Sequence, residues 1–293
     1  MRRTGSLALL LLLATGASAQ EAATTFKSTE IAAGIYMIEG ADGFAGGNMG
    51  LLVGEDHIAM IDDGLEPSAP QLLEFVEQVA GGPITFVVNT HVHGDHAGGN
   101  AHFAENDAIV VAHENIRQRL LADAGPAGGP AGLPVMTFTD SVSFHLNGIE
   151  AHVHHVPGAH TDGDAFIVFP DVDVIHAGDV WFHDRFPYID LDNGGTLDGY
   201  IAAQRKIIEM AGQDTTIVPG HGPLGSRADM EANLSMLIDA QAAVRQLLDE
   251  GLSEDEIVAA NPLAEFHDKY DWAFITTERM TRTLVRGLQS EGS

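Results

Sequence analysis

The sequence of 293 residues contains no cysteine. This absence excludes disulfide bonds, thiolate metal ligands, thiol nucleophiles and lipid attachment to cysteine, so any metal must be held by nitrogen and oxygen. Basic residues are also scarce, because 14 Lys and Arg stand against 42 Asp and Glu and leave a formal net charge of −28. Such a surface repels phosphate backbones and anionic lipid headgroups. We therefore expect no nucleic-acid partner and no binding to membrane surfaces.

Charged residues make up only 19% of the chain, whereas hydrophobic residues make up 45%. This balance, with 33 Gly and 12 Pro, is typical of a folded protein and argues against long disordered segments. The low-complexity stretch GPAGGPAGLP at residues 125–134 predicts a surface loop. The length fits one large domain or two small ones.

The first 19 residues have the pattern of a secretory signal peptide. Arg2 and Arg3 precede an apolar run at residues 7–14, and small residues end in Ala17-Ser18-Ala19. The run is too short to span a bilayer. We expect cleavage before Gln20, a secreted protein that would lie in the periplasm of a Gram-negative cell, and no membrane association after cleavage.

Hydrophobic patterning predicts strands that alternate with helices. Predicted strands cover residues 35–38, 50–53, 57–61, 83–88, 109–112, 150–156, 165–169, 172–176 and 215–218. Predicted helices cover residues 71–80 and 114–124, a long segment beyond residue 225, a short segment opened by the capping box Ser253-x-x-Glu256, and residues 280–288. This alternation, with polar clusters after the strands, indicates an α/β layered architecture.

The densest polar cluster is Thr90-His-Val-His-Gly-Asp-His96, which directly follows a predicted strand. In an extended backbone, His91 and His93 point the same way, so both can reach one metal ion. Asp95 and His96 can serve a second ion beside it. Further candidate ligands follow other predicted strands. They are His160, Asp179 and His221.

The order of these motifs resembles that of the metallo-β-lactamase-fold hydrolases, from residue 31 to about 225. The motifs are T-H-x-H-x-D-H, G-x-H-T-x-G-D, A-G-D and G-H-G. The resemblance implies a four-layer αβ/βα sandwich over residues 20–225. The helical extension, residues 226–293, would pack on the same domain.

The resemblance also implies a site for two metal ions. One ion would be held by His91, His93 and His160, and the other by Asp95, His96 and His221. Asp179 would bridge the two ions. Asp62 matches an early buried carboxylate of the family that supports the histidine loop from behind.

Five imidazoles and two carboxylates suit two zinc ions best, with iron or manganese as alternatives. The resemblance implies a zinc-dependent hydrolase in which a metal-bridging hydroxide attacks the carbonyl of a small molecule and Asp95 orients that hydroxide and moves its proton. Lactam or amide hydrolysis of the β-lactamase type is the first expectation, because the chain carries a secretion signal. Many zinc β-lactamases have Cys where Asp179 stands, so a thioesterase resembling glyoxalase II or a lactonase is the alternative. A non-catalytic metal-binding protein is the third reading, and the oligomeric state stays open.

Three residues are candidate substrate contacts. Phe44 lies in a glycine-rich segment where relatives carry a hairpin over the site. Arg185 follows Asp179 and could grip a substrate carboxylate or form a surface ion pair. Asn193 could donate to an oxyanion. Three arginines on one face of the last predicted helix are expected to be structural: Arg279, Arg282 and Arg286.

Overall fold

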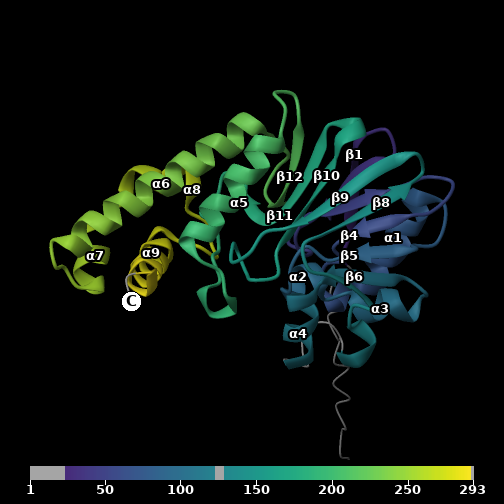
Figure 1. The fold of residues 1–293 in the computed structure, drawn as a ribbon, viewed down its shortest axis with the longest axis horizontal. Helices are drawn as coiled ribbons and strands as arrows, with labels where there is room; N and C mark the ends of the chain where they lie inside the picture. The colour runs from purple at the N-terminus through teal and green to yellow at the C-terminus, as the bar shows by residue number, and fades with distance from the viewer. Residues whose placement is uncertain (1–23, 123–128, 292–293) are drawn as a thin grey trace, which may run out of the picture.

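The computed structural model describes residues 24–122 and 129–291, so the predicted signal peptide lies outside the described residues. The described chain forms two mixed β-sheets with helices on their outer faces (Figure 1). Among the described residues, no helix is both long and apolar enough to cross a lipid bilayer.

The first sheet has seven strands in sequence order. They are β1 (Phe26–Ala32), β2 (Ile35–Gly40), β3 (Met49–Leu52), β4 (Ala59–Ile61), β5 (Phe86–Val88), β6 (Ile109–His113) and β7 (Met136–Phe138). Neighbours are antiparallel from β1 to β4 and parallel from β4 to β7. The parallel half places the carboxyl ends of β4 and β5 side by side, and the residues that follow these strands face the candidate site.

The second sheet has six strands in the order β13-β12-β11-β10-β9-β8. They are β8 (Ser141–Leu146), β9 (Ile149–His155), β10 (Ala165–Phe169), β11 (Val174–Phe182), β12 (Thr216–His221) and β13 (Gly225–Ser226). Only β11 and β12 are parallel, and their register shifts twice, between His176 and Gly178 and between Gly178 and Phe182. These irregularities lie beside Asp179.

Helices cover the outer faces of both sheets and form the tail of the chain. In sequence order they are α1 (Ala69–Ala80), α2 (Gly94–Ala97), α3 (Asn100–Glu105), α4 (Glu114–Ala122), α5 (Leu197–Met210), α6 (Arg227–Asp249), α7 (Glu254–Ala260), α8 (His267–Tyr270) and α9 (Thr277–Glu291). Leu72 and Val76 of α1 pack on the first sheet, and Ile207 of α5 packs on the second. Residues of both sheets, such as Ile61 and Ile167, share the core between them. The order of layers confirms the predicted four-layer sandwich.

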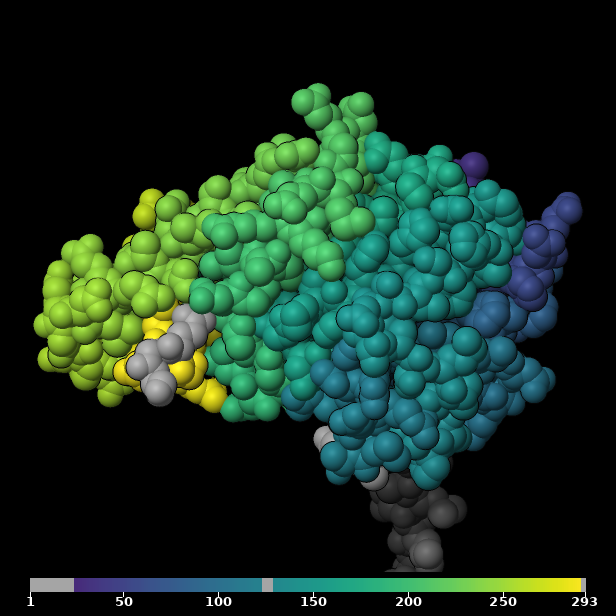
Figure 2. Space-filling model, in the orientation of Figure 1, coloured from purple at the N-terminus to yellow at the C-terminus, as the bar shows by residue number. Residues whose placement is uncertain are grey.

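The tail beyond β13 packs on α5 rather than forming a separate core. Leu197 and Tyr200 of α5 share one apolar cluster with Leu237 of α6 and Leu284 of α9. The tail forms a lobe at one end of the molecule (Figures 1 and 2). The predicted capping box is present at the start of α7, where Glu256 accepts a hydrogen bond from Ser253 N at 2.9 Å.

Several elements differ from the sequence expectations. The prediction that strand 172–176 ends before Asp179 is wrong, because β11 continues to Phe182 and the buried Asp179 lies inside it. Helix α5 was not predicted, although Thr196 is an N-cap whose side chain accepts from Gly199 N. Strands β1, β7, β8 and β13 were also not predicted, since three of them carry mostly exposed or half-exposed residues and one has two residues.

Candidate metal centre

The candidate ligands come from loops and strand ends at one edge of the two sheets. The histidine loop follows β5, and its last residues form α2, whose N-cap is His93. His160 lies between β9 and β10, and His221 ends β12. The structure brings all seven candidate ligands from these separate segments into one cluster.

The first ligand group contains His91, His93, His160 and Asp179, whose ligand atoms lie within 4.8 Å of one another. His160 Nε2 is 2.8 Å from His93 Nδ1. Asp179 Oδ2 is 3.5 Å from His91 Nε2 and 3.4 Å from His160 Nε2. Because a metal–nitrogen bond is about 2 Å long, one cation placed between these atoms could contact all four residues.

The second ligand group contains Asp95, His96 and His221. Asp95 Oδ2 is 3.2 Å from His221 Nε2. The other carboxylate oxygen of Asp179, Oδ1, lies 3.1 Å from His96 Nε2 and 3.5 Å from His221 Nε2. Asp179 therefore presents one oxygen to each ligand group.

The donor atoms fit a metal ion better than they fit one another. His91 Nε2 and Asp179 Oδ1 are buried and make no hydrogen bond. A buried polar atom without a partner is costly, so most such atoms in folded proteins are satisfied by some partner. Imidazole nitrogens with carboxylate oxygens form a donor set suited to zinc and to other divalent transition metals.

The electrostatics of the cluster favour the same conclusion. Burial lowers the pKa of His160 to about 4 and that of His91 well below its usual value, so both rings are neutral at pH 7, the form that binds metal. Burial opposes charge on His96, but Asp179, Asp62 and Asp95 outweigh it and raise its pKa. The negative charge of these carboxylates, which stabilises a proton on the buried imidazole, would also attract a metal cation.

Asp62 lies behind the histidine loop, where the sequence analysis placed it. Its backbone has a φ of 60°, in the left-handed region, and its N–H donates to Val88 O. Its carboxylate accepts hydrogen bonds from Thr90 N at 2.7 Å, from Thr90 Oγ1 at 2.8 Å and from His96 Nδ1 at 2.7 Å. These bonds orient His96 Nε2 toward the ligand cluster.

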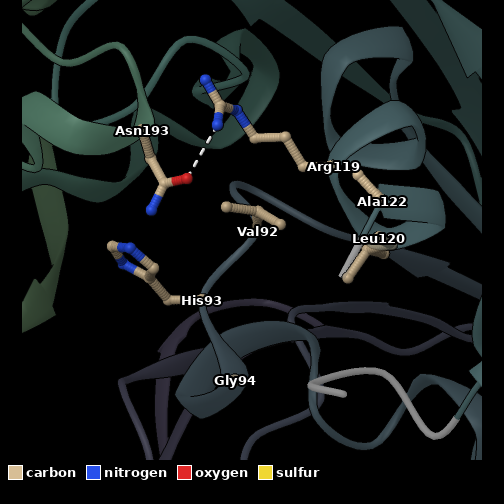
Figure 3. Close-up of a pocket in the computed structure, with 7 residues that line it drawn as sticks. All are labelled: Val92, His93, Gly94, Arg119, Leu120, Ala122 and Asn193. Atoms are coloured by element: carbon tan, nitrogen blue, oxygen red, sulfur yellow. Dashed lines mark hydrogen bonds between the residues drawn. The ribbon is translucent and has the colours of Figure 1, made fainter. Parts of the chain in front are cut away.

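A second supporting carboxylate, Asp190, was missed by the sequence analysis. It accepts from His93 Nε2 at 2.8 Å, which leaves His93 Nδ1 facing His160. It also accepts from Asn193 Nδ2 at 2.7 Å, and Asn193 Oδ1 accepts from Arg119 at 2.7 Å (Figure 3). Arg119 is paired through two bonds with Asp162. The spacing Asp190-x-x-Asn193, a turn-capping pattern before α5, was the available signal.

A cavity of about 280 Å³ opens beside His93 (Figure 3). It is lined by Val92, His93, Gly94, Arg119, Leu120, Ala122 and Asn193. Asn193 borders the site, as expected, but both ends of its amide are already hydrogen bonded. Its expected role as an oxyanion donor stays a prediction.

Phe44 and Arg185 lie on the side of the second ligand group. The Phe44 ring is 68% exposed and stacks on His221, with 6.0 Å between the ring centroids. The Arg185 guanidinium lies 5.1 Å from the centroid of Trp272, whose ring is 6.2 Å from that of His221. No carboxylate lies within ion-pair distance of Arg185 in the described part of the chain, so the alternative of a surface ion pair is not what the structure contains.

The four-layer fold and its His/Asp cluster define a class of metal-dependent hydrolases. A family model described as the Metallo-beta-lactamase superfamily matches residues 42–221, which is more than half of the chain. The chain therefore belongs to the metallo-β-lactamase superfamily.

Curated relatives are similar over part of their length. A hydroxyacylglutathione hydrolase of Nitrosococcus oceani is 30% identical over 178 residues, which are 59% of this chain and 60% of that protein. A hydroxyacylglutathione hydrolase of a Polaromonas species is 29% identical over 147 residues, 49% of this chain and 51% of that protein. The chain thus spans between half and three fifths of the length of these relatives.

Solved structures with the same fold are more distant in sequence. A metallo-beta-lactamase from Pontibacter korlensis is 19% identical, with a TM-score of 0.65, and the match covers 73% of this chain and 100% of that chain. The DIM-1 metallo-beta-lactamase is 14% identical, with a TM-score of 0.63, and the match covers 74% of this chain and 99% of that chain. At these identities the likeness establishes the fold alone.

We predict that Gly220→Ala disrupts metal binding. A Cβ at Gly220 would overlap Asp179 Oδ1 and would lie 2.7 Å from the backbone carbon of Gly178, so Asp179 must shift. We expect zinc affinity to fall at least about tenfold in a zinc titration. Gly212→Ala is the matched control, because a Cβ there meets its nearest atom, Thr215 Oγ1, at 3.4 Å. Equal zinc affinity in the two variants would contradict the prediction.

Proposed function

We propose that this protein is a dinuclear zinc hydrolase that cleaves carbonyl compounds. The observation that carries the proposal is the position of Asp179, which directs Oδ2 toward the group of His91 and His160 and Oδ1 toward the group of His96 and His221. A carboxylate shared in this way suits two cations side by side better than one.

Two bound zinc ions would polarise a carbonyl oxygen and lower the pKa of a coordinated water toward about 7. The chain supplies the positioning. His91, His96 and His160 are buried, whereas the side chains of His93 and Asp95 are 21% and 23% exposed. Substrate therefore reaches the cluster on the side of His93 and Asp95.

Asp95 is suited to orient a water molecule and to accept its proton. Burial opposes its ionisation, but His96 and His221 outweigh burial and lower its pKa, so it is a carboxylate at neutral pH. A proton taken up by Asp95 can then pass to the leaving alkoxide, thiolate or amide.

For the substrate, we propose esters and thioesters first. The curated relatives are hydroxyacylglutathione hydrolases, and this chain has an aspartate and no cysteine at the bridging position. Lactam hydrolysis was the first expectation from the sequence. The predicted signal peptide keeps lactam opening as the second candidate, because β-lactams act outside the cytoplasm. We also propose that the protein acts after export, on small molecules rather than on nucleic acids.

The proposal is tested with purified protein reconstituted with zinc. We expect about two zinc ions per chain and turnover of at least one ester, thioester or lactam in a panel of 4-nitrophenyl acetate, lactoylglutathione, a lactone and nitrocefin. A chelator should abolish that turnover, and added zinc should restore it. One zinc ion or none would reject the dinuclear site, and turnover that is indifferent to chelation would reject the metal-dependent reaction.

A further inference from the structure

The tail of the chain contributes two aromatic side chains to the rim of the candidate metal centre. Trp272 and Phe274 lie in the segment between α8 and α9, outside the region that the family model matches. Together with Tyr188 they form an aromatic wall, in which Phe274 is 5.6 Å from Trp272 and 5.4 Å from Tyr188 between ring centroids. Trp272 Nε1 donates to Phe186 O at 2.9 Å, which anchors the wall to the second half of the domain.

The aromatic wall extends from one ligand group to the other. Tyr188 stacks on His93 of the first group, at 5.6 Å and an interplanar angle of 24°. Trp272 lies 6.2 Å from His221 of the second group. A substrate whose carbonyl lies between the two groups would therefore have the wall beside it. Because Phe274 is 47% exposed, part of the wall is free to contact an apolar group.

Two guanidinium groups lie on the aromatic wall. Arg279 is 4.2 Å from the centroid of Phe274 and 5.2 Å from that of Tyr188, and Arg185 lies over Trp272. Arg279 Nη1 donates to Phe274 O at 2.8 Å, so one edge of its guanidinium is fixed to the wall. Neither arginine has a carboxylate within ion-pair distance among residues 24–122 and 129–291.

Other arginines near the centre or on the same helix are already paired. Arg119 binds Asp162, Arg286 binds Asp192 at 2.6 Å, and Arg282 contacts three carboxylates. All three arginines of α9 are expected to be structural, and Arg279 differs from the other two because it contacts the aromatic wall and not an acid. In a protein with three times as many acids as bases, an unpaired arginine at the site retains its charge for a ligand.

We infer that Arg279, assisted by Arg185, binds the free carboxylate of a substrate whose apolar or aromatic group lies against the aromatic wall. This inference rests on the proposed function and specifies its substrate class. The substrate would be an ester or thioester that also carries one free carboxylate. A guanidinium that lies over aromatic rings and is fixed by one hydrogen bond offers its remaining N–H donors in a planar fork, which matches the two oxygens of a carboxylate. Arg279 is thus a specificity-determining residue supplied by the tail.

The kinetic test compares two esters of the same phenol, 4-nitrophenyl hydrogen succinate and 4-nitrophenyl butyrate. The first ends in a carboxylate where the second ends in a methyl group. For Arg279→Gln we expect KM for the anionic ester to rise about tenfold with little change in kcat, and both constants for the neutral ester to change less than about twofold. Arg279→Lys, which keeps the charge but not the fork, should give an intermediate KM.

Arg286→Gln is the matched control, because it removes the same charge from the same helix but at a site where the arginine is already paired with Asp192. It should leave both esters unaffected. If Arg286→Gln raises KM for the anionic ester as much as Arg279→Gln does, the effect comes from net charge and the inference is rejected. An equal effect of Arg279→Gln on both esters rejects it as well.

A binding measurement separates this inference from the proposed function. Trp272 and the fully buried Trp181 are the two tryptophans of the chain. Quenching of tryptophan fluorescence that disappears in Trp272→Phe therefore reports on the aromatic wall. Phenylacetate should quench this fluorescence in zinc-reconstituted protein. We expect its affinity to be about tenfold lower for Arg279→Gln and unchanged for Arg286→Gln. If no ester, thioester or lactam is hydrolysed but this dependence holds, the hydrolase proposal fails and the carboxylate site stands. Phenylacetate binding that ignores Arg279 overturns the site.

Discussion

Asp179→Asn is expected to leave a folded protein that retains about one zinc ion or fewer and that loses about a thousandfold in kcat/KM. The substitution keeps the volume of the side chain but removes the negative charge that both ligand groups share. His96 and His221 are each within 3.5 Å of Asp179 Oδ1, so their group is left with Asp95 as its only carboxylate. Metal analysis after reconstitution and turnover of the best substrate measure the effect.

The control for this substitution is Asp171→Asn. Asp171 is exposed, lies in the turn between β10 and β11, accepts a hydrogen bond from Glu150 N and belongs to neither ligand group. Its replacement should leave zinc content and turnover as they are. If Asp179→Asn retains two zinc ions and full activity, Asp179 does not bridge the two groups.

Asp62→Ala is expected to lower the free energy of unfolding by about 3 kcal/mol or more and to weaken zinc binding by about 10- to 100-fold. Asp62 is fully buried and accepts three hydrogen bonds, two from Thr90 and one from His96. Its loss leaves these donors without partners in the core and frees the imidazole of His96 to rotate. Chemical denaturation and a zinc titration measure the two effects separately.

Asp63→Ala is the matched control for Asp62→Ala. Asp63 is also fully buried, and its carboxylate accepts from Gly99 N at 2.8 Å but contacts no candidate ligand. Burial and the adjacent Asp62 raise its pKa well above the usual value. The variant should lose stability while its zinc affinity stays nearly constant. A fall in zinc affinity as large as that of Asp62→Ala would show that Asp62 acts through general stability and not through His96.

The layered fold and the family were both predictable from the sequence, because the signals involved are local. The segment Thr90-His-Val-His-Gly-Asp-His96 directly follows a strand rich in β-branched residues. Its metal-ligating residues have a spacing that is specific to few folds. Separate motifs in a fixed order around it narrow the choice of fold further. The comparisons confirm the superfamily, and the order of sheets and helices confirms the sandwich.

Supporting residues were predictable only where they match a residue of the family that the chain resembles. Asp62 was predicted because it matches an early carboxylate of the family, whereas Asp190 was missed because its partner His93 is 97 positions away. The position of Asp179 inside β11 was not predicted either, because the sequence gives no sign that the strand continues beyond His176. The strand continues past Gly178, whose φ of 52° and close approach to Thr90 give no strand signal in the sequence.

By itself, the sequence determined the types of ligand atom, their order along the chain and the layered architecture, because residue chemistry and hydrophobic period are local properties. Only the tertiary structure decided which atoms meet. It turned the two oxygens of Asp179 toward different ligand groups, and it brought Trp272, Phe274 and Arg279 of the tail to the rim of the site. These contacts depend on how α9 packs on α5 and α6, which follows from the shapes of side chains in a shared core. That complementarity joins residues distant in sequence, and no local pattern encodes it.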